Sequence, residues 1–259
     1  MKDIKQILLS VLGEKRYLAL LASSFQKALR IGLPGTDYQD VYFLKEFIQE
    51  GNYCVDIGAH LGYYTCELSR LVKNSGKVFA IEPMSKFNSA LKNLLRGKKV
   101  SNVDLQQVAL GGDGEYVDMG IPKLDNMKKF AYARVMKTSE HLEYIETERI
   151  KNETGDHLFF DLARLDFIKC DVEGLEVPVF ASMTNTLEKH RPILLCELAD
   201  DNERIKLYEM IDHLGYQVYT LSDKKLSLLD VYSNKKAISH NHYFIPQHHE
   251  EKLKHLIAK

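Results

Sequence analysis

The chain of 259 residues carries almost no net charge, only four cysteines and no long apolar run, and each shortage excludes a class of protein. A formal net charge of −1 gives no sign of a partner such as nucleic acid or an anionic membrane. Charged residues interrupt the apolar N-terminal segment, so the sequence predicts neither a signal peptide nor a membrane span. We therefore expect a cytoplasmic protein whose partner is a small molecule.

The cysteines and histidines lack the spacing of a metal or redox site. Cys54, Cys170 and Cys196 lie inside apolar runs, and no CxxC pair occurs, so we expect small core side chains in a reducing compartment. Four histidines, at positions 240, 242, 248 and 249, gather near the C-terminus. A metal site there would need a further ligand from another part of the chain, and we predict no metal cofactor.

Short apolar runs alternate with helical patterns from residue 53 to the C-terminus. These runs are too short for helices, and their continuous apolar character is typical of strands in a parallel sheet that helices cover on both faces. With 45% hydrophobic and 27% charged residues, the chain has enough apolar side chains for such a core. We therefore predict an α/β fold with strands at Tyr53–Ile57, Lys77–Ile81, Val103–Leu110, Phe167–Cys170, Ile193–Leu198, Gln217–Leu221 and Tyr243–Ile245.

Two segments lie outside this alternation. Residues 1–33 place apolar side chains at helical spacing between charges, which predicts an N-terminal amphipathic helical extension before the main domain of residues 34–259. We expect its apolar face to pack on the domain, because amphipathic faces usually serve the core, and a cap over a site or a homodimer contact is the alternative. Residues 111–164 are long for a connection and predict a substrate loop or lid, with a surface hairpin as the alternative.

The stretch "VDIGAHLGYYT", residues 55–65, joins the first predicted strand to a helix and carries the first candidate ligand site. Ligands of an open parallel sheet bind beyond the C-terminal ends of the strands, where Asp56 lies. Gly58 and Gly62 permit a tight turn and a close approach to the backbone. A dinucleotide site would need glycine where His60 stands, and Asp56 would repel a diphosphate. The aspartate instead suits a cationic ligand such as S-adenosylmethionine.

Glu82 ends the second predicted strand and adds to this site. Its two carboxylate oxygens can accept both hydroxyls of a ribose. Glu82 alone would serve a nicotinamide dinucleotide equally well, and a single acid at a strand end is commonly a helix cap or a solvated residue. Together with Asp56 and the two glycines, however, Glu82 favours S-adenosylmethionine.

A second group of acids lies in "IKCDVEGLE", residues 168–176, at the end of the fourth predicted strand. The helix dipole accounts for Glu173 and Glu176 near a helix N-terminus. Asp171 directly follows the buried run, so we expect it to point into the cleft beyond the strands. With Glu197 at the end of the fifth strand, Asp56 and Asp171 would form a negative pocket that suits a cationic cofactor.

These stretches resemble the FkbM family of S-adenosylmethionine-dependent methyltransferases. The resemblance covers residues 51–246, and the block around Asp171 is its most specific part. It rests, in chain order, on "VDIGAHLGYYT", "FAIEP", "VALG", "LDFIKCDVEGLE", "RPILLCEL" and "NHYFIP". It implies a Rossmann-like methyltransferase fold, with a mostly parallel seven-stranded sheet, helices on both faces and an antiparallel final strand. It also implies O-methylation of a hydroxyl on a sugar, a glycan precursor or a natural product.

The resemblance also implies roles for single residues. Asp171 and Glu173 would face the reacting centre as catalytic residues, one of them taking the proton of the hydroxyl, with a histidine as the alternative base. The sequence departs from the family at two places. His60 stands where the family usually shows asparagine, a change we expect the site to tolerate. No threonine-leucine-aspartate is recognisable between Glu140 and Leu165, which indicates an unusual insertion and with it an unusual substrate. The residues that would contact S-adenosylmethionine are Asp56, Gly58, Ala59, His60, Gly62, Tyr63, Glu82, Pro83, Val108, Ala109 and Asp171.

Two other functions compete with an O-methyltransferase. A catalytically silent, methyltransferase-like module would bind the cofactor or a partner chain, although the intact acids argue against it. A nicotinamide-dependent reductase would need the glycine that His60 replaces. Binding of S-adenosylmethionine without binding of NAD would exclude the reductase, and turnover would exclude the silent module.

Overall fold

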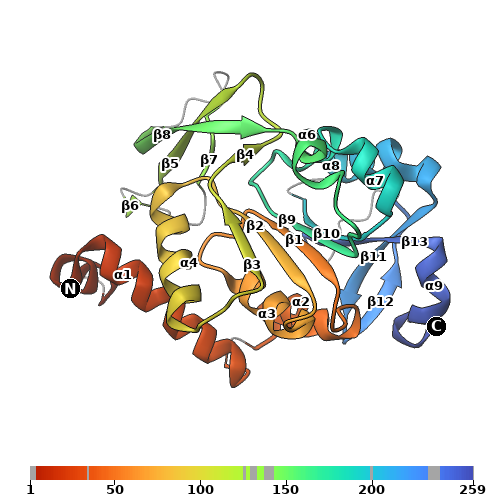
Figure 1. The fold of residues 1–259 in the computed structure, drawn as a ribbon, viewed down its shortest axis with the longest axis horizontal. Coiled ribbons are helices and arrows are strands. Elements are labelled where there is room, and N and C mark those ends of the chain that lie inside the picture. The colour runs from red at the N-terminus through yellow and green to blue at the C-terminus, as the bar shows by residue number, and fades with distance from the viewer. Residues whose placement is uncertain are drawn as a thin grey trace.

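A computed structural model describes residues 4–33, 35–124, 127–128, 133–136, 143–198, 201–232 and 240–258. Within them, a sheet of eight strands runs through the centre of the molecule, between two layers of helices (Figure 1). The strands of this central sheet are β1 (Tyr53–Ile57), β2 (Lys77–Ile81), β3 (Val103–Gln106), β9 (Phe167–Cys170), β10 (Ile193–Glu197), β11 (Tyr216–Ser222), β12 (Lys225–Leu228) and β13 (Asn241–Pro246).

Five neighbouring strands of the central sheet run parallel, in the order β10-β9-β1-β2-β3. β13 pairs antiparallel with β10, β11 pairs antiparallel with β13, and β12 pairs antiparallel with β11 at the edge. The predicted Rossmann-like α/β sheet with an antiparallel final strand is confirmed, with eight strands instead of seven. The chain adds β2 and β3 on one side of β1 and later adds β9 and β10 on the other, which creates a switch point between β1 and β9.

The third predicted strand, Val103–Leu110, was wrong in its extent. β3 ends at Gln106, and Ala109–Leu110 forms β4, which pairs with β8 (Tyr144–Glu153) outside the central sheet. β3 lies at the edge of the sheet, so no further strand holds the chain there after Gln106. Both halves of the run favour extended backbone, and the sequence pattern therefore did not show where the chain leaves the sheet.

Residues 111–164, the predicted insertion, form most of a second sheet, above the central one in Figure 1. Its strands follow the order β4-β8-β5-β6, and β7 pairs with β5. The long antiparallel ladder of β5 and β8 shows that much of the insertion is a hairpin. Its role as a lid stays a prediction. The remaining elements of this segment are β5 (Tyr116–Leu124), β6 (Met127–Lys128), β7 (Arg134–Val135) and α5 (Gly155–Phe159).

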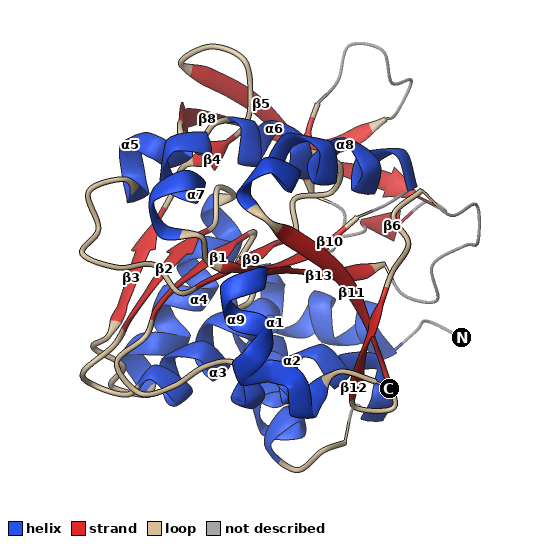
Figure 2. Ribbon diagram, turned by 90° about the vertical axis from the view of Figure 1, so that its right-hand side faces the viewer, coloured by secondary structure: helices blue, strands red, loops and turns tan. Residues whose placement is uncertain are grey.

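Helices cover both faces of the central sheet (Figure 2). The first layer consists of α5, α6 (Glu176–Ala181), α7 (Thr184–His190) and α8 (Asp201–Ile211). The second consists of α1 (Ile4–Arg30), α2 (Gln39–Phe43), α3 (Tyr63–Val72), α4 (Ser85–Gly97) and α9 (Gln247–Leu253). None of the helices in the described ranges has both the length and the apolar composition that crossing a bilayer requires.

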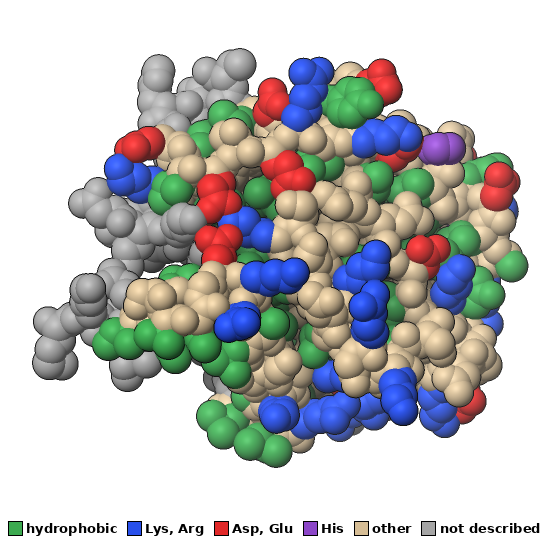
Figure 3. Space-filling view, turned by 60° about the vertical axis from the view of Figure 1, so that its left-hand side comes forward, with side chains coloured by type: hydrophobic (Ala, Val, Ile, Leu, Met, Phe, Trp, Pro, Cys, Tyr) green, Lys and Arg blue, Asp and Glu red, His purple; other side chains and the backbone are tan. Residues whose placement is uncertain are grey.

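The N-terminal helix α1 packs on the domain. Gly13, with φ of 71° and ψ of 159°, interrupts it. Beyond this break, Tyr17, Leu18 and Ala22 are buried in one apolar cluster with residues of α4. Figure 3 shows the molecule from the side of α1 and α4. The apolar face of this part of α1 therefore packs on the domain, as the sequence led us to expect. The domain boundary at residue 33 stays a prediction.

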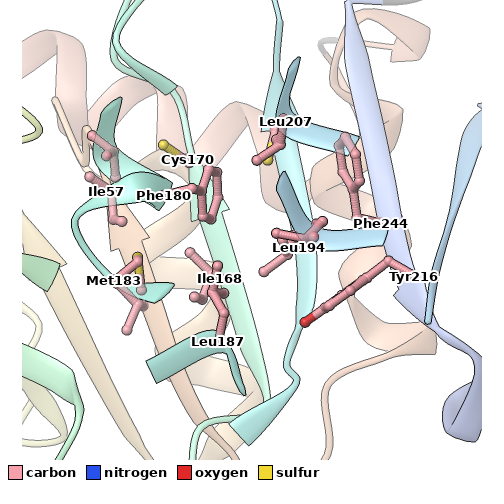
Figure 4. Packing of buried hydrophobic residues seen from close by; sticks show 14 of the residues in the cluster. Ile57, Ile168, Cys170, Phe180, Met183, Leu187, Leu194, Leu207, Tyr216 and Phe244 are labelled. Carbon is pink, nitrogen blue, oxygen red and sulfur yellow. The ribbon is translucent and has the colours of Figure 1, made fainter. Parts of the chain in front are cut away.

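Buried side chains from α6, α7 and their connection fill the space over the sheet (Figure 4). Phe180, Met183 and Leu187 belong to one cluster with Ile168 of β9 and Leu194 of β10. Burying one such side chain contributes about 1.5–3 kcal/mol. This core fixes the ends of β9 and β10, which carry the acidic residues of the candidate site. The cysteines expected in the core, Cys54, Cys170 and Cys196, are buried free thiols.

Candidate active site

A cleft of about 730 Å³ lies beyond the C-terminal ends of β1, β2, β9 and β10. Its position at the switch point of the sheet is where ligands of open α/β sheets bind. Tyr38, Gln39 and Asp40, at the start of α2, form one wall, and Met119 of β5 and Val135 of β7 contribute to another. The volume is typical of a site for a cofactor or a drug-sized ligand.

The turn after β1 depends on glycine at position 58. Gly58 has φ of +82°, and a Cβ atom added there would lie 1.8 Å from the carbonyl oxygen of Asp171. The amide of Asp171 donates to the carbonyl of Ile57 at 3.0 Å, so the ends of β1 and β9 meet directly. A residue without a side chain is therefore required where Asp56 and Asp171 enter the same cleft.

Asp56 lines the cleft from the end of β1, with 2% of its surface exposed. The Thr65 hydroxyl donates to its carboxylate at 2.5 Å, which ties β1 to α3. Burial raises the pKa of Asp56 to about 6, and the hydrogen bond from Thr65 and the nearby Lys169 ammonium limit the rise. A cationic ligand in the cleft would favour the ionised form of this carboxylate.

Glu82 follows β2 and is almost fully buried at the wall of the cleft. The backbone amides of His60 and Met84 donate to its two oxygens at 2.7 and 2.9 Å. Burial raises the pKa of Glu82 to about 8, against the effect of these two hydrogen bonds. Because a carboxylate oxygen has more than one acceptor position, each can still receive a hydroxyl from a ligand.

Lys169, on β9, is a buried cation beside the acids. Its Nζ lies 3.5 Å from Oδ2 of Asp171 and 5.1 Å from the centre of the Tyr64 ring. Burial alone would lower the pKa of Lys169, but the facing Asp171 carboxylate, Tyr64 and Glu197 raise it above its usual range. The Lys169 ammonium therefore lies where it can hold the Asp171 carboxylate in place.

Glu173 and Glu197 line the cleft on either side of Asp171. Burial, then the Asp171 and Glu197 carboxylates, raise the pKa of Glu173 to about 7, and Arg134 of β7 opposes them. Partial desolvation and Asp171 also raise the pKa of Glu197. Neighbouring carboxylates cannot all ionise without cost, so Glu173 can change its protonation state near neutral pH.

Glu176 braces the loop that presents Glu173. It is buried at the start of α6, and its carboxylate accepts the amide of Val172 at 3.0 Å and that of Gly174 at 3.1 Å. Glu173, between these two residues, has the left-handed φ of 57°. Such a backbone conformation persists only where the surroundings fix it, and it is common at functional sites. Glu176 therefore has a structural role, whereas Glu173 faces the cleft.

The structure brings together most of the residues expected at the site. Gly62 does not line the cleft. It has φ of +83°, its carbonyl accepts the Gln26 side chain at 2.9 Å, and an added Cβ would lie 2.4 Å from Cδ1 of Leu91. It thus joins α3 to α1 and α4. The expected residues that line the cleft are Asp56, Gly58, Ala59, His60, Tyr63, Glu82, Pro83, Val108, Ala109, Asp171 and Glu173.

Sequence reasoning missed Lys169 and Asp40. Asp40 is buried in α2, accepts the Tyr243 hydroxyl at 2.6 Å and the Asn241 side chain at 2.9 Å, and lines the cleft. Lys169 did carry a signal, because a lysine within an apolar strand is rarely fully buried without a partner. Asp40 carried none, since its partners on β13 lie about 200 residues away and only the fold brings them near.

The C-terminal histidines form no cluster of metal ligands. His242 is buried, and its Nδ1 lies 2.9 Å from the carbonyl oxygen of His240, which lines the cleft. In the part of the chain that the structure describes, no group of three or more His, Cys, Asp or Glu side chains could hold a metal ion. The absence of a metal cofactor stays a prediction.

Comparison with known proteins relates residues 56–221 to one family, described as the methyltransferase FkbM domain. A methyltransferase FkbM from Methylobacillus flagellatus is 18% identical and has a TM-score of 0.49, over 74% of this chain and 43% of that one. An S-adenosylmethionine-dependent O-methyltransferase from Thermotoga maritima is 14% identical and has a TM-score of 0.45, over 80% and 63%. The chain thus spans less than two thirds of these two relatives. No curated protein matches the sequence.

Proposed function

Since this chain belongs to the FkbM methyltransferase family, we propose that it is an O-methyltransferase that acts on a hydroxyl of a sugar, a glycan precursor or a natural product. The cofactor expected from the sequence, S-adenosylmethionine, is confirmed by the family. The observation that carries the proposal is the group of Asp171, Glu173 and Lys169 at the end of β9, beside the acids of β1 and β2.

The residues of the cleft fit S-adenosylmethionine. A carboxylate only accepts hydrogen bonds, so Glu82 suits the two hydroxyls of a ribose and Asp56 suits a positively charged group. Pro83, Val108 and Ala109 would provide an apolar wall for the adenine. The cofactor supplies, when bound, a methyl group on a positively charged sulfur. The volume of about 730 Å³ leaves room for part of an acceptor.

On the acceptor side, we assign different roles to the two neighbouring acids. The Glu173 carboxylate takes the proton of the acceptor hydroxyl, because its pKa of about 7 is close to the working pH. Asp171 is held by the Lys169 ammonium at 3.5 Å, and it orients the hydroxyl by accepting a hydrogen bond. Met119 and Val135 of the second sheet would cover the acceptor and exclude water, which is the lid role proposed for the insertion.

The test combines titration with turnover. Isothermal titration should show binding of S-adenosylmethionine and not of NAD, and release of S-adenosylhomocysteine should depend on an acceptor from a panel of saccharides, nucleotide sugars and polyols. Glu173→Gln should lower turnover at least a hundredfold while leaving cofactor binding intact, and Glu115→Gln, at an exposed residue just before β5, is the matched control. Cofactor binding without turnover on any hydroxyl would favour the silent module, and transfer to nitrogen or carbon would refute the O-methylation.

A cytoplasmic site of action is part of the proposal. All four cysteines are free thiols, which a reducing compartment favours.

A further inference from the structure

The surface formed by α1 and α4 differs in composition from the chain as a whole. Of the ten large hydrophobic side chains that are exposed among the described residues, half lie between positions 7 and 33. Val11, Ile31 and Leu33 are more than 70% exposed. Monomeric proteins seldom gather exposed aliphatic side chains in this way unless a partner or a membrane covers them. The exposed members of this group are Ile7, Val11, Leu20, Ile31 and Leu33.

The same surface is strongly basic. From residue 7 to the end of α1 and along α4, the chain carries seven Lys and Arg side chains against one acid, Glu14. Lys86 pairs with Glu14 and also with Glu146. Figure 3 shows Lys and Arg gathered in the middle and along the bottom of this face, with hydrophobic side chains at its lower left. The exposed basic residues are Lys15, Arg16, Lys27, Arg30, Lys92 and Arg96.

After the break at Gly13, basic and aliphatic side chains share one exposed face of α1. Arg16, Leu20 and Lys27 follow one another at helical spacing, so they point to the same side, and all three are exposed. Ile7 and Val11 are one turn apart before the break at Gly13. The opposite face of α1 is already buried on α4. A helix with this pattern is typical of segments that lie in the interface of a bilayer.

We propose that the α1–α4 surface docks on an anionic lipid bilayer, with Ile7, Val11 and Leu20 at the level of the acyl chains and the surrounding Lys and Arg side chains on lipid phosphates. A second copy of the chain fits this surface less well, because two basic faces would repel each other. Nucleic acid fits less well too, because the exposed hydrophobic side chains here are all aliphatic and offer no ring for a base to stack on.

The α1–α4 surface lies close to the cleft. Phe25 of α1 packs on Tyr38 and Tyr63, with ring centres 4.6 and 4.0 Å away, and both tyrosines line the cleft. A bilayer held against α1 would thus lie one aromatic layer from the cleft wall. This placement fits an acceptor that a membrane presents, such as a lipid-linked glycan precursor. That consequence rests on the proposed function, whereas docking itself does not.

The test uses the full chain and lipid vesicles. The protein should sediment with vesicles of phosphatidylcholine and phosphatidylglycerol but not with phosphatidylcholine alone, and high salt should release it. Lys92→Glu/Arg96→Glu should weaken binding roughly thirtyfold or more at low salt, since each basic side chain near the surface contributes about 1 kcal/mol. The charge-matched control is Lys224→Glu/Lys252→Glu, whose exposed residues lie just before β12 and in α9, and α9 is at the opposite end of the molecule from α1 in Figure 1. It should bind like the parent.

The apolar part of the surface has its own pair of variants. Val11→Glu should weaken vesicle binding at least tenfold, whereas Leu228→Glu, at another exposed aliphatic residue, should not. Unchanged melting temperature and unchanged S-adenosylmethionine titration would show that both variants fold. Equal binding to neutral and anionic vesicles, no binding at all, or full binding by Val11→Glu would overturn the proposal. A chain that does not bind vesicles but forms a dimer, or binds duplex DNA or RNA, would also overturn it, if Lys92→Glu/Arg96→Glu abolishes that association. If the parent chain binds vesicles as expected but transfers no methyl group to any hydroxyl, only the proposed function is refuted.

Discussion

Replacing Gly58 by alanine should damage both stability and cofactor binding, and the chain provides a matched control. Gly58 and Gly114 have almost the same positive φ, +82° and +81°. A Cβ at Gly58 would lie 1.8 Å from the carbonyl oxygen of Asp171, whereas a Cβ at Gly114 meets no atom within 4 Å. The two substitutions therefore share the cost of a positive φ and differ in steric contact.

The magnitudes follow from these two costs. A left-handed alanine costs about 1–2 kcal/mol at either position. Overpacking adds about 1–3 kcal/mol at position 58, where the clashing atom is backbone and cannot turn aside. For a chain of this size each kcal/mol lowers the melting temperature by about 2–4 °C, so Gly58→Ala should melt about 2–12 °C below Gly114→Ala.

The functional part of this prediction concerns the same contact. Separating the ends of β1 and β9 would move Asp56 and Asp171 apart, so Gly58→Ala should weaken S-adenosylmethionine binding at least tenfold, and Gly114→Ala should leave it unchanged. Thermal unfolding followed by circular dichroism and isothermal titration below the melting temperature measure the two effects. Equal melting temperatures for the two variants would show that the close approach of Gly58 to Asp171 does not limit the fold.

Three further predictions concern single side chains of the cleft. Glu82→Gln should weaken S-adenosylmethionine binding at least tenfold, about 1.4 kcal/mol, because an amide presents only one acceptor oxygen; unchanged titration would reject Glu82 as the ribose ligand. The folded pKa of Glu82, about 8, lies above its ordinary value, so its contribution to stability is present below about pH 4.5 and is lost as the pH rises through 8. Glu82→Gln should therefore reduce the fall in melting temperature of the ligand-free protein between pH 5 and 8, and an identical fall would contradict this assignment. Glu173→Gln should lower kcat by about 10²–10⁴-fold and remove a rise in kcat around pH 7, and a pH profile that keeps this rise would remove Glu173 as the base.

The parallel strands of the central sheet could be predicted from the sequence because they are buried on both faces. β1, β2 and β10 are almost continuously apolar, and such runs are too short to be helices. β12 was harder to predict from the sequence, because an edge strand needs only half of its side chains buried. The break after Gln106 could not be read, because pairing between β4 and β8 decides it, and that pairing joins segments about 40 residues apart.

The acidic residues of the site could be predicted from the sequence for a different reason. Asp56 lies near the end of β1, and Glu82 and Asp171 directly follow β2 and β9. Parallel strands bring their C-terminal ends to one edge of the sheet. Asp40 reaches the same cleft from a short helix, held by the hydroxyl of Tyr243. No local pattern specifies such a contact. Lys169 is an intermediate case. The sequence shows its charge within β9 but does not show its contact with Asp171.

The net charge of the chain does not describe its separate surfaces. A value of −1 is a sum over the whole chain, and the structure separates the contributions in space. Acids such as Asp56, Glu82 and Asp171 gather in the cleft, where they suit a cationic cofactor, while α1 and α4 carry an excess of Lys and Arg. Near-neutrality therefore results from an acidic cleft and a basic surface whose charges cancel in the sum. An overall charge close to zero excludes a membrane surface only when the charges are also mixed locally, and in this fold they are not.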